Sequence, residues 1–134
     1  TRRGRGGRGA GAHPSGTRRI SDDEITQIAQ WLSKIEPRQP EPLAAPLTDE
    51  RKAAAAKLYA ETCEACHGKT GREPLEGFPA IAGQKRAYVV VQLTDIKTKA
   101  RANGQSEAMQ GAIAEMKDAD LQLLADYVSQ LTPR

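Results

Sequence analysis

The stretch CEACHG, residues 63–68, places two cysteines three positions apart and a histidine directly after the second. Closely spaced thiols serve in four kinds of site: a disulfide, a structural metal site, a redox-active dithiol or the covalent attachment of a cofactor. The chain has no other cysteine, whereas a secreted disulfide scaffold would need more pairs. The chemistry must therefore account for both thiols and the imidazole.

The first three kinds of site each leave part of this stretch unexplained. A thioredoxin-like dithiol lies on a strand-to-helix turn, and no strand pattern is evident here. A structural zinc site needs four ligands. The chain offers only Cys63, Cys66, His67 and a distant His13, and adjacent Cys66 and His67 fit one tetrahedral ion poorly. A disulfide would leave His67 without a role.

Covalent attachment of haem accounts for all three residues. Each thiol adds to one haem vinyl group, and the cysteine spacing matches the two vinyl positions on one porphyrin edge. The imidazole of His67 then lies under the iron as an axial ligand. Cys-x-x-Cys-His is among the more specific short motifs, so we predict one covalent haem c bound by Cys63, Cys66 and His67. Zinc and a dithiol remain the alternatives.

The pattern outside this motif is typical of an all-α protein. Apolar residues recur at helical spacing, and no alternating strand pattern stands out. The chain has only one Trp, one Phe and three Tyr, so a buried organic cofactor would help to fill a thin core. Residues 68–84 are rich in glycine and proline and predict a loop. Helices are predicted at residues 21–36, 48–62, 85–101, 106–115 and 118–131.

Residues 1–19 are rich in arginine and glycine and contain no acidic residue, which predicts a disordered tail. Residues 47–134 contain twelve basic and twelve acidic side chains, so the basic charge belongs to the tail. Binding of the tail to nucleic acid, or an artefact of cloning or of the gene boundary, is less favoured. No run of about 18 apolar residues is present, and no apolar signal segment begins the chain. We interpret the chain as mature, processed or a fragment.

One internal repeat relates residues 20–37 to residues 116–133 at an offset of 96. The apolar positions match nearly throughout, and Trp31 falls over Tyr127. We interpret residues 20–36 as the closing helix of an upstream domain, joined by a proline-rich linker at 37–46. The identical pairs are Asp22/Asp118, Ala29/Ala125, Ser33/Ser129 and Pro37/Pro133.

Several further features accompany the haem motif. They are Tyr59 four residues before Cys63, GFPAIAGQ at 77–84, Tyr88 with Gln92 and Leu93, Met109, and LADYVSQL at 124–131. With these features, residues 47–134 resemble a class I c-type cytochrome, most closely the bacterial periplasmic kind whose tandem two-haem relatives are called cytochrome c-four. The resemblance implies short helices around a haem. It also implies that the first and last helices of the domain cross at a small residue, here Ala55, with Tyr59 and Tyr127 packed at the crossing.

A methionine opposite the histidine is the usual sixth ligand of an electron-transfer haem. The candidates are Met109 and Met116. The family places this methionine several residues before the acidic cap of the last helix, and Met109 lies nine residues before Asp118. We therefore predict that Met109 binds the iron and that Met116 belongs to the core.

The resemblance also implies how the haem is surrounded. The backbone carbonyl of Pro79 would accept a hydrogen bond from the His67 ring. Arg101 is the favoured neighbour of a haem propionate within a cluster of basic residues near 85–101, most of which we interpret as a solvated face. The predicted walls of the pocket are Phe78, Ile81, Tyr88 and Leu93.

The resemblance implies single-electron transfer by a carrier that is not an enzyme by itself. We expect it in the bacterial periplasm, soluble or peripherally associated, with periplasmic or membrane-bound redox partners. The alternative is a haem subunit or fragment of a larger dehydrogenase or multi-haem complex. A haem sensor or peroxidase would need an open iron face. His13 lies opposite Met109 in the repeat, but without a second haem motif we interpret it as a tail histidine.

Overall fold

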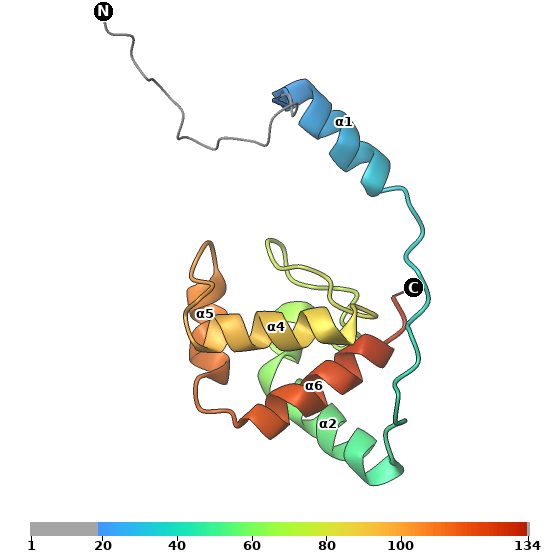
Figure 1. Cartoon of the computed structure of the whole chain (residues 1–134), viewed down its shortest axis with the longest axis vertical. Helices are drawn as coiled ribbons and strands as arrows, with labels where there is room; N and C mark the ends of the chain where they lie inside the picture. Colours follow the sequence, from blue (N-terminus) through green and yellow to red (C-terminus); the bar gives the residue numbers. More distant parts are fainter. Residues whose placement is uncertain (1–18, 134) are drawn as a thin grey trace, which may run out of the picture. The chain divides into compact units, whose positions relative to one another are not determined.

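The computed structural model describes residues 19–133, and this part of the chain contains helices and no strand. The all-α prediction is confirmed. The chain divides into two compact units, one ending at Glu36 and the other beginning at Pro37, and each is described by itself. The helices are α1 (Asp22–Leu32), α2 (Asp49–Thr62), α3 (Glu64–His67), α4 (Arg86–Lys97), α5 (Ser106–Ile113) and α6 (Asp118–Gln130) (Figure 1).

The helix of the first unit, α1, begins at a capping box. The Ser21 hydroxyl accepts a hydrogen bond from the Glu24 amide at 3.2 Å, and the Ser21 amide donates to the Glu24 carboxylate at 2.8 Å. The helix ends at Leu32, four residues earlier than predicted, and a turn follows. Pro37 contributes to this early end, because the residue before a proline avoids helical backbone angles.

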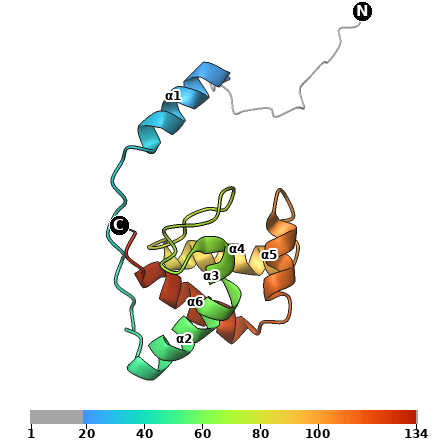
Figure 2. The ribbon, with the colours of Figure 1, turned by 180° about the vertical axis from the view of Figure 1, so that it is seen from behind.

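The second unit is built around α6, which packs against both α2 and α4 (Figures 1 and 2). At the crossing of α2 and α6, Ala55 and Ala125 are each 0% exposed, and the rings of Tyr59 and Tyr127 lie 5.5 Å apart. The predicted crossing is confirmed, and its small residues let the two backbones approach closely. The buried apolar core consists of Ala55, Tyr59, Leu93, Ile96, Ile113, Leu121, Leu124, Ala125 and Val128.

One carboxylate connects the three long helices of this unit. Asp126 of α6 forms ion pairs with Arg86 of α4 and, at 3.7 Å, with Arg51 of α2. The Asp126 side chain is 16% exposed, so water screens these pairs only partly. The network fixes α2 and α4 to the same turn of α6.

Other helix ends also differ from the predicted ones. The helix predicted at 85–101 ends at Lys97, because Lys99 adopts a left-handed backbone with φ +66° that stops the helix. The last helix begins at Asp118, as predicted, and the Lys117 amide before it donates to the Asp120 carboxylate at 3.3 Å. The short helix α3 was not predicted, since four residues carry too little periodicity to be recognised.

Candidate functional site

The predicted haem residues lie where α2 passes directly into α3. The Cys63 amide closes α2 by donating to the Tyr59 carbonyl at 2.7 Å, and the Cys63 carbonyl accepts from the His67 amide at 2.9 Å. A single helical turn therefore carries Cys63, Cys66 and His67. The turn fixes their order and spacing against the end of a long helix (Figure 2).

The imidazole of His67 is held in one orientation. Its side chain lies in the interior, with the residue only 7% exposed, and its Nδ1 lies 2.8 Å from the carbonyl oxygen of Pro79. A carbonyl can only accept, so the proton lies on Nδ1 and the lone pair on Nε2. The predicted hydrogen bond to Pro79 is confirmed. A histidine with Nδ1 engaged and Nε2 basic is arranged as a metal ligand.

The loop that carries Pro79 is fixed by backbone hydrogen bonds. The Leu75 amide donates to the Cys66 carbonyl at 3.1 Å, and the Gly83 amide donates to the Val128 carbonyl of α6 at 3.0 Å. The loop leaves α3 at Gly68, whose φ of +84° favours glycine and where a Cβ would lie 2.4 Å from the Glu73 carbonyl oxygen. The acceptor for His67 therefore belongs to an ordered loop.

The two thiols are not joined to each other, and they do not resemble a redox dithiol. Burial and, to a smaller extent, the nearby Cys66 raise the pKa of the Cys63 thiol to about 11. Redox-active Cys-x-x-Cys pairs need a lowered thiol pKa, so the dithiol alternative is disfavoured. Within residues 19–133, no group of three or more His, Cys, Asp and Glu side chains lies close enough together to hold a metal ion.

The two methionines lie on separate elements, as predicted. Met109 belongs to α5, whereas Met116 lies in the connection to α6, where its amide donates to the Ile113 carbonyl at 3.0 Å. Both side chains are partly buried against the core. The backbone carbonyl of Met116 also accepts a hydrogen bond from the Lys97 ammonium group. The residues present fit a covalent haem: two unpaired thiols, an imidazole with a basic Nε2 and a thioether on the last helix before α6.

A sequence model described as cytochrome c matches residues 52–132. The chain belongs to the cytochrome c family. The family implies a covalent c-type haem and electron transfer through it, and the stretch from Cys63 to His67 fits the Cys-x-x-Cys-His motif.

Named relatives agree with this assignment. The chain is 39% identical over 75 residues to cytochrome c4 of Pseudomonas aeruginosa, which covers 56% of this chain and 36% of that protein. It is 29% identical over 116 residues to a protein of Thiomonas intermedia named thiosulfate dehydrogenase electron acceptor. This match covers 82% of this chain and 54% of that protein. The chain thus spans about a third to a half of the length of these relatives.

A solved structure of reduced recombinant cytochrome c4 from Pseudomonas stutzeri has a similar fold. The TM-score is 0.72 at 27% identity, and the match covers 84% of this chain and 62% of that one. The class I cytochrome c fold predicted from the sequence is thereby confirmed. None of the described helices is both long and apolar enough to cross a membrane.

The other predicted pocket residues of this cytochrome domain differ in exposure. Phe78 is half-buried, and its ring meets the His67 ring edge-on with centroids 6.4 Å apart. Leu93 lies in the core, and Ile81 packs against that core. Tyr88 is 51% exposed on the outer side of α4.

The basic residues near 85–101, which were predicted to form a cluster, each contact a different partner. Arg86 binds Asp126, Lys97 lies 3.7 Å from the Asp118 carboxylate, and Lys85 lies 3.8 Å from that of Glu41. Arg101 is exposed, and its guanidinium donates to the side-chain oxygen of Gln92 at 2.8 Å. Gln92 was noted in the resemblance but not among the predicted site residues. This pair is the remaining candidate for a propionate contact.

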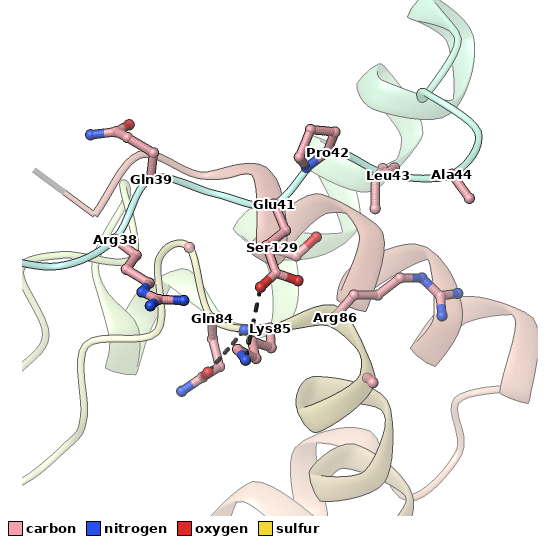
Figure 3. A pocket seen from close by; sticks show the side chains of 12 residues that line it. Arg38, Gln39, Glu41, Pro42, Leu43, Ala44, Gln84, Lys85, Arg86 and Ser129 are labelled. Atoms are coloured by element: carbon pink, nitrogen blue, oxygen red, sulfur yellow. Dashed lines mark hydrogen bonds and ion pairs between the residues drawn. The ribbon is translucent and has the colours of Figure 1, made fainter.

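A cavity of about 310 Å³ lies elsewhere in the second unit, between the linker and the start of α4 (Figure 3). There the Gln130 side-chain amide donates to the Glu41 carbonyl at 2.8 Å, and Glu41 also pairs with Lys85. Neither the haem motif nor Met109 lines it. The cavity marks where the proline-rich linker follows the domain surface and is separate from the haem site.

Sequence reasoning missed the role of one side chain next to this site. Tyr59 was interpreted only as a packing residue at the helix crossing. In the structure its hydroxyl also donates to the carbonyl of Gly68, the residue directly after His67, at 2.7 Å. The sequence showed only that a tyrosine lies four residues before the motif, and it did not indicate the hydrogen-bond partner of this tyrosine.

Proposed function

We propose that this chain transfers single electrons through one covalently attached haem with histidine and methionine as axial ligands. Cys63 and Cys66 each form a thioether, His67 supplies Nε2, and Met109 supplies its sulfur. The observation that supports this assignment is the hydrogen bond from His67 Nδ1 to the Pro79 carbonyl at 2.8 Å. That bond leaves Nε2 basic beside the two cysteines that can tether a porphyrin.

The chain's own residues then prepare the site for electron transfer. Cys63 and Cys66 would hold the haem through one thioether bond each. His67 keeps its proton on Nδ1 and donates it in the hydrogen bond to the Pro79 carbonyl, while Phe78, Ile81 and Leu93 exclude water. When bound, the haem iron supplies the change between ferric and ferrous states. No substrate bond is made or broken, so the domain acts as a carrier and not as an enzyme by itself.

The intact mass of residues 1–134, produced in a host that attaches haem, tests haem attachment directly. We expect the mass of the polypeptide plus one haem, and a haem-dependent peroxidase stain on a denaturing gel. Extraction of the haem by acidic organic solvent would contradict the thioether bonds. Replacing both cysteines, as Cys63→Ser with Cys66→Ser, should remove the stain.

A pair of methionine variants tests the sixth ligand. Met109→Ala should abolish the weak far-red sulfur-to-iron band of the ferric protein, lower the reduction potential and open the iron to carbon monoxide. Met116→Leu is the matched control and should keep the band, at a cost of under about 1.5 kcal/mol in folding free energy. The reverse outcome would assign the ligand to Met116. Carbon monoxide binding by the unaltered protein would favour a sensor or peroxidase.

A second proposal concerns α1, which we interpret as the closing helix of an upstream cytochrome domain. Its pattern repeats that of α6, and its apolar side chains are exposed within its own unit. The similarity to cytochrome c4 supports this interpretation, because the match covers 84% of the chain and therefore more than the haem domain. The mass of the native protein should then correspond to a longer chain with two haems. A native chain of the printed length with one haem would contradict it.

We further propose that the protein works in the bacterial periplasm with redox proteins as donor and acceptor. Similarity to proteins named cytochrome c4 and thiosulfate dehydrogenase electron acceptor supports a dehydrogenase as one such partner. A free carrier should elute at its own mass from a size-exclusion column loaded with native extract. Elution with a larger enzyme would favour the alternative, a haem subunit of a dehydrogenase or multi-haem complex.

A further inference from the structure

The hydroxyl group of Tyr59 lies inside the domain next to the haem motif. Tyr59 is 1% exposed, and its hydroxyl donates to the Gly68 carbonyl at 2.7 Å. Gly68 follows His67 directly, so the bond fixes the backbone where the chain leaves the motif. A phenylalanine at position 59 would fill the same space in the core. Packing alone therefore does not explain why this residue carries a hydroxyl group that donates to Gly68.

The same hydroxyl also lies near the middle of the loop. Gly71 is buried with φ +70°, and a Cβ placed there would lie 3.3 Å from the Tyr59 hydroxyl oxygen. The Gly71 amide donates to the Gly68 carbonyl at 3.2 Å. Tyr59 therefore holds Gly68 by a hydrogen bond and lies near Gly71.

Gly71 in turn holds the segment that carries the acceptor for His67. Its carbonyl accepts hydrogen bonds from the Ile81 amide at 2.8 Å and the Ala82 amide at 3.0 Å. Pro79, whose carbonyl accepts from His67, lies two residues before Ile81. A continuous series of contacts thus runs from the Tyr59 hydroxyl through Gly68 and Gly71 to the Pro79 carbonyl.

We propose that Tyr59 is a positioning residue for His67: its hydroxyl fixes the 68–82 loop and thereby sets the strength of the hydrogen bond from His67 Nδ1 to Pro79. This role rests on the proposed ligation of iron by His67. A stronger Nδ1 hydrogen bond makes the imidazole a better donor and favours ferric iron. Removal of the hydroxyl leaves the partly buried Gly68 carbonyl with one partner fewer and relaxes the loop.

The test compares Tyr59→Phe with Tyr127→Phe in the haem-loaded protein. The Tyr127 ring packs against the Tyr59 ring at a tilt of 48°, and among the described residues its hydroxyl has no hydrogen-bond partner, so Tyr127→Phe removes a hydroxyl without touching the loop. In Tyr59→Phe we expect the His67 Nδ1–H proton resonance of the reduced protein to move upfield and the midpoint potential to become more positive. In Tyr127→Phe both should equal those of the unaltered protein.

Two outcomes would overturn the proposal: neither variant moves the Nδ1–H resonance and the potential, or both variants move them equally. If Tyr59→Phe fails to mature, Gly71→Ala serves instead, because its Cβ would press on the hydroxyl and on the Ala82 amide. The same upfield shift is expected there, and an unchanged resonance contradicts the proposal. Failure of the proposed function is distinct, since it appears as missing covalent haem in the intact mass or as the iron-bound histidine being other than His67.

Discussion

Helices α1 and α6 have the same pattern of residues and opposite surroundings. Leu124 of α6 is 1% exposed, whereas its counterpart in the repeat, Ile28 of α1, is 47% exposed. Tyr127 of α6 packs against Tyr59, whereas Trp31 at the matching position is 65% exposed. In the second unit, α2 and α4 cover the apolar face of α6, and within the first unit the matching face of α1 is exposed.

This difference separates what an amphipathic pattern determines from what it does not. The pattern and the caps are enough to form both helices, since Ser21 caps α1 and the Asp120 carboxylate accepts from the Lys117 amide at the start of α6. Stabilisation by burial requires a second apolar surface, which α6 has and α1 lacks within its own unit. The comparison therefore predicts that matched substitutions have unequal effects on the two helices.

The largest difference is expected for truncation of a matched pair of apolar side chains. Leu124→Ala should lower the free energy of unfolding of the haem domain by about 2–5 kcal/mol, because it leaves a cavity in the core. Ile28→Ala should leave this free energy within about 0.5 kcal/mol of the unaltered protein. Urea unfolding followed by haem absorbance measures both. Equal losses would mean that the face of α1 is covered in solution.

The next difference concerns the small residue of the repeat. Ala125→Leu should destabilise the domain by about 1–3 kcal/mol, since α2 leaves no room for a larger side chain at the crossing. Ala29→Leu, the matching change in the exposed α1, should have no measurable effect on domain unfolding. A tolerated Ala125→Leu would show that the helix crossing can open.

The ion-pair network is expected to contribute less. Asp126→Asn should cost about 1 kcal/mol of domain stability, because the carboxylate loses both arginines. Asp118→Asn on the same helix is the control, and it should cost less because the Asp118 side chain is 93% exposed. The gap between the two variants should shrink in about 1 M salt, which screens the exposed arginine partners. In α1 the matching position is Gln30, so this network is particular to α6.

The smallest effect at neutral pH is expected from the ionisation of Tyr59. Burial raises the pKa of Tyr59 from 10.0 to about 12, with the nearby Cys63 as the next cause. A pKa that is higher in the folded state stabilises the fold fully below pH 10, and this contribution is lost as the pH rises towards 12. Unfolding midpoints should fall between pH 10 and 12, and Tyr59→Phe should reduce that fall. Tyr127→Phe should leave the difference intact, and a fall of unchanged size in Tyr59→Phe would contradict the assignment.

The haem motif could be predicted from the sequence because its chemistry is contained in five consecutive residues, 63–67. The choice of Met109 over Met116 drew on the family resemblance, and the structure adds that the two side chains lie on separate elements. The role of Tyr59 could not be predicted, since its partners Gly68 and Gly71 offer only backbone groups. Every residue has a backbone carbonyl, so the sequence does not indicate which carbonyl the Tyr59 hydroxyl will bind.

The sequence by itself determined the all-α class, the helix starts near residues 21 and 48, and the Cys-x-x-Cys-His motif that supports the proposed haem site. These features depend on residues within one or two turns of each other, so local physical chemistry decides them. Only the tertiary structure decided which apolar face is covered and how the 68–82 loop is held beside His67. Both depend on surfaces and carbonyl groups that segments distant in the sequence bring together, and a pattern along the chain does not encode which of them will meet.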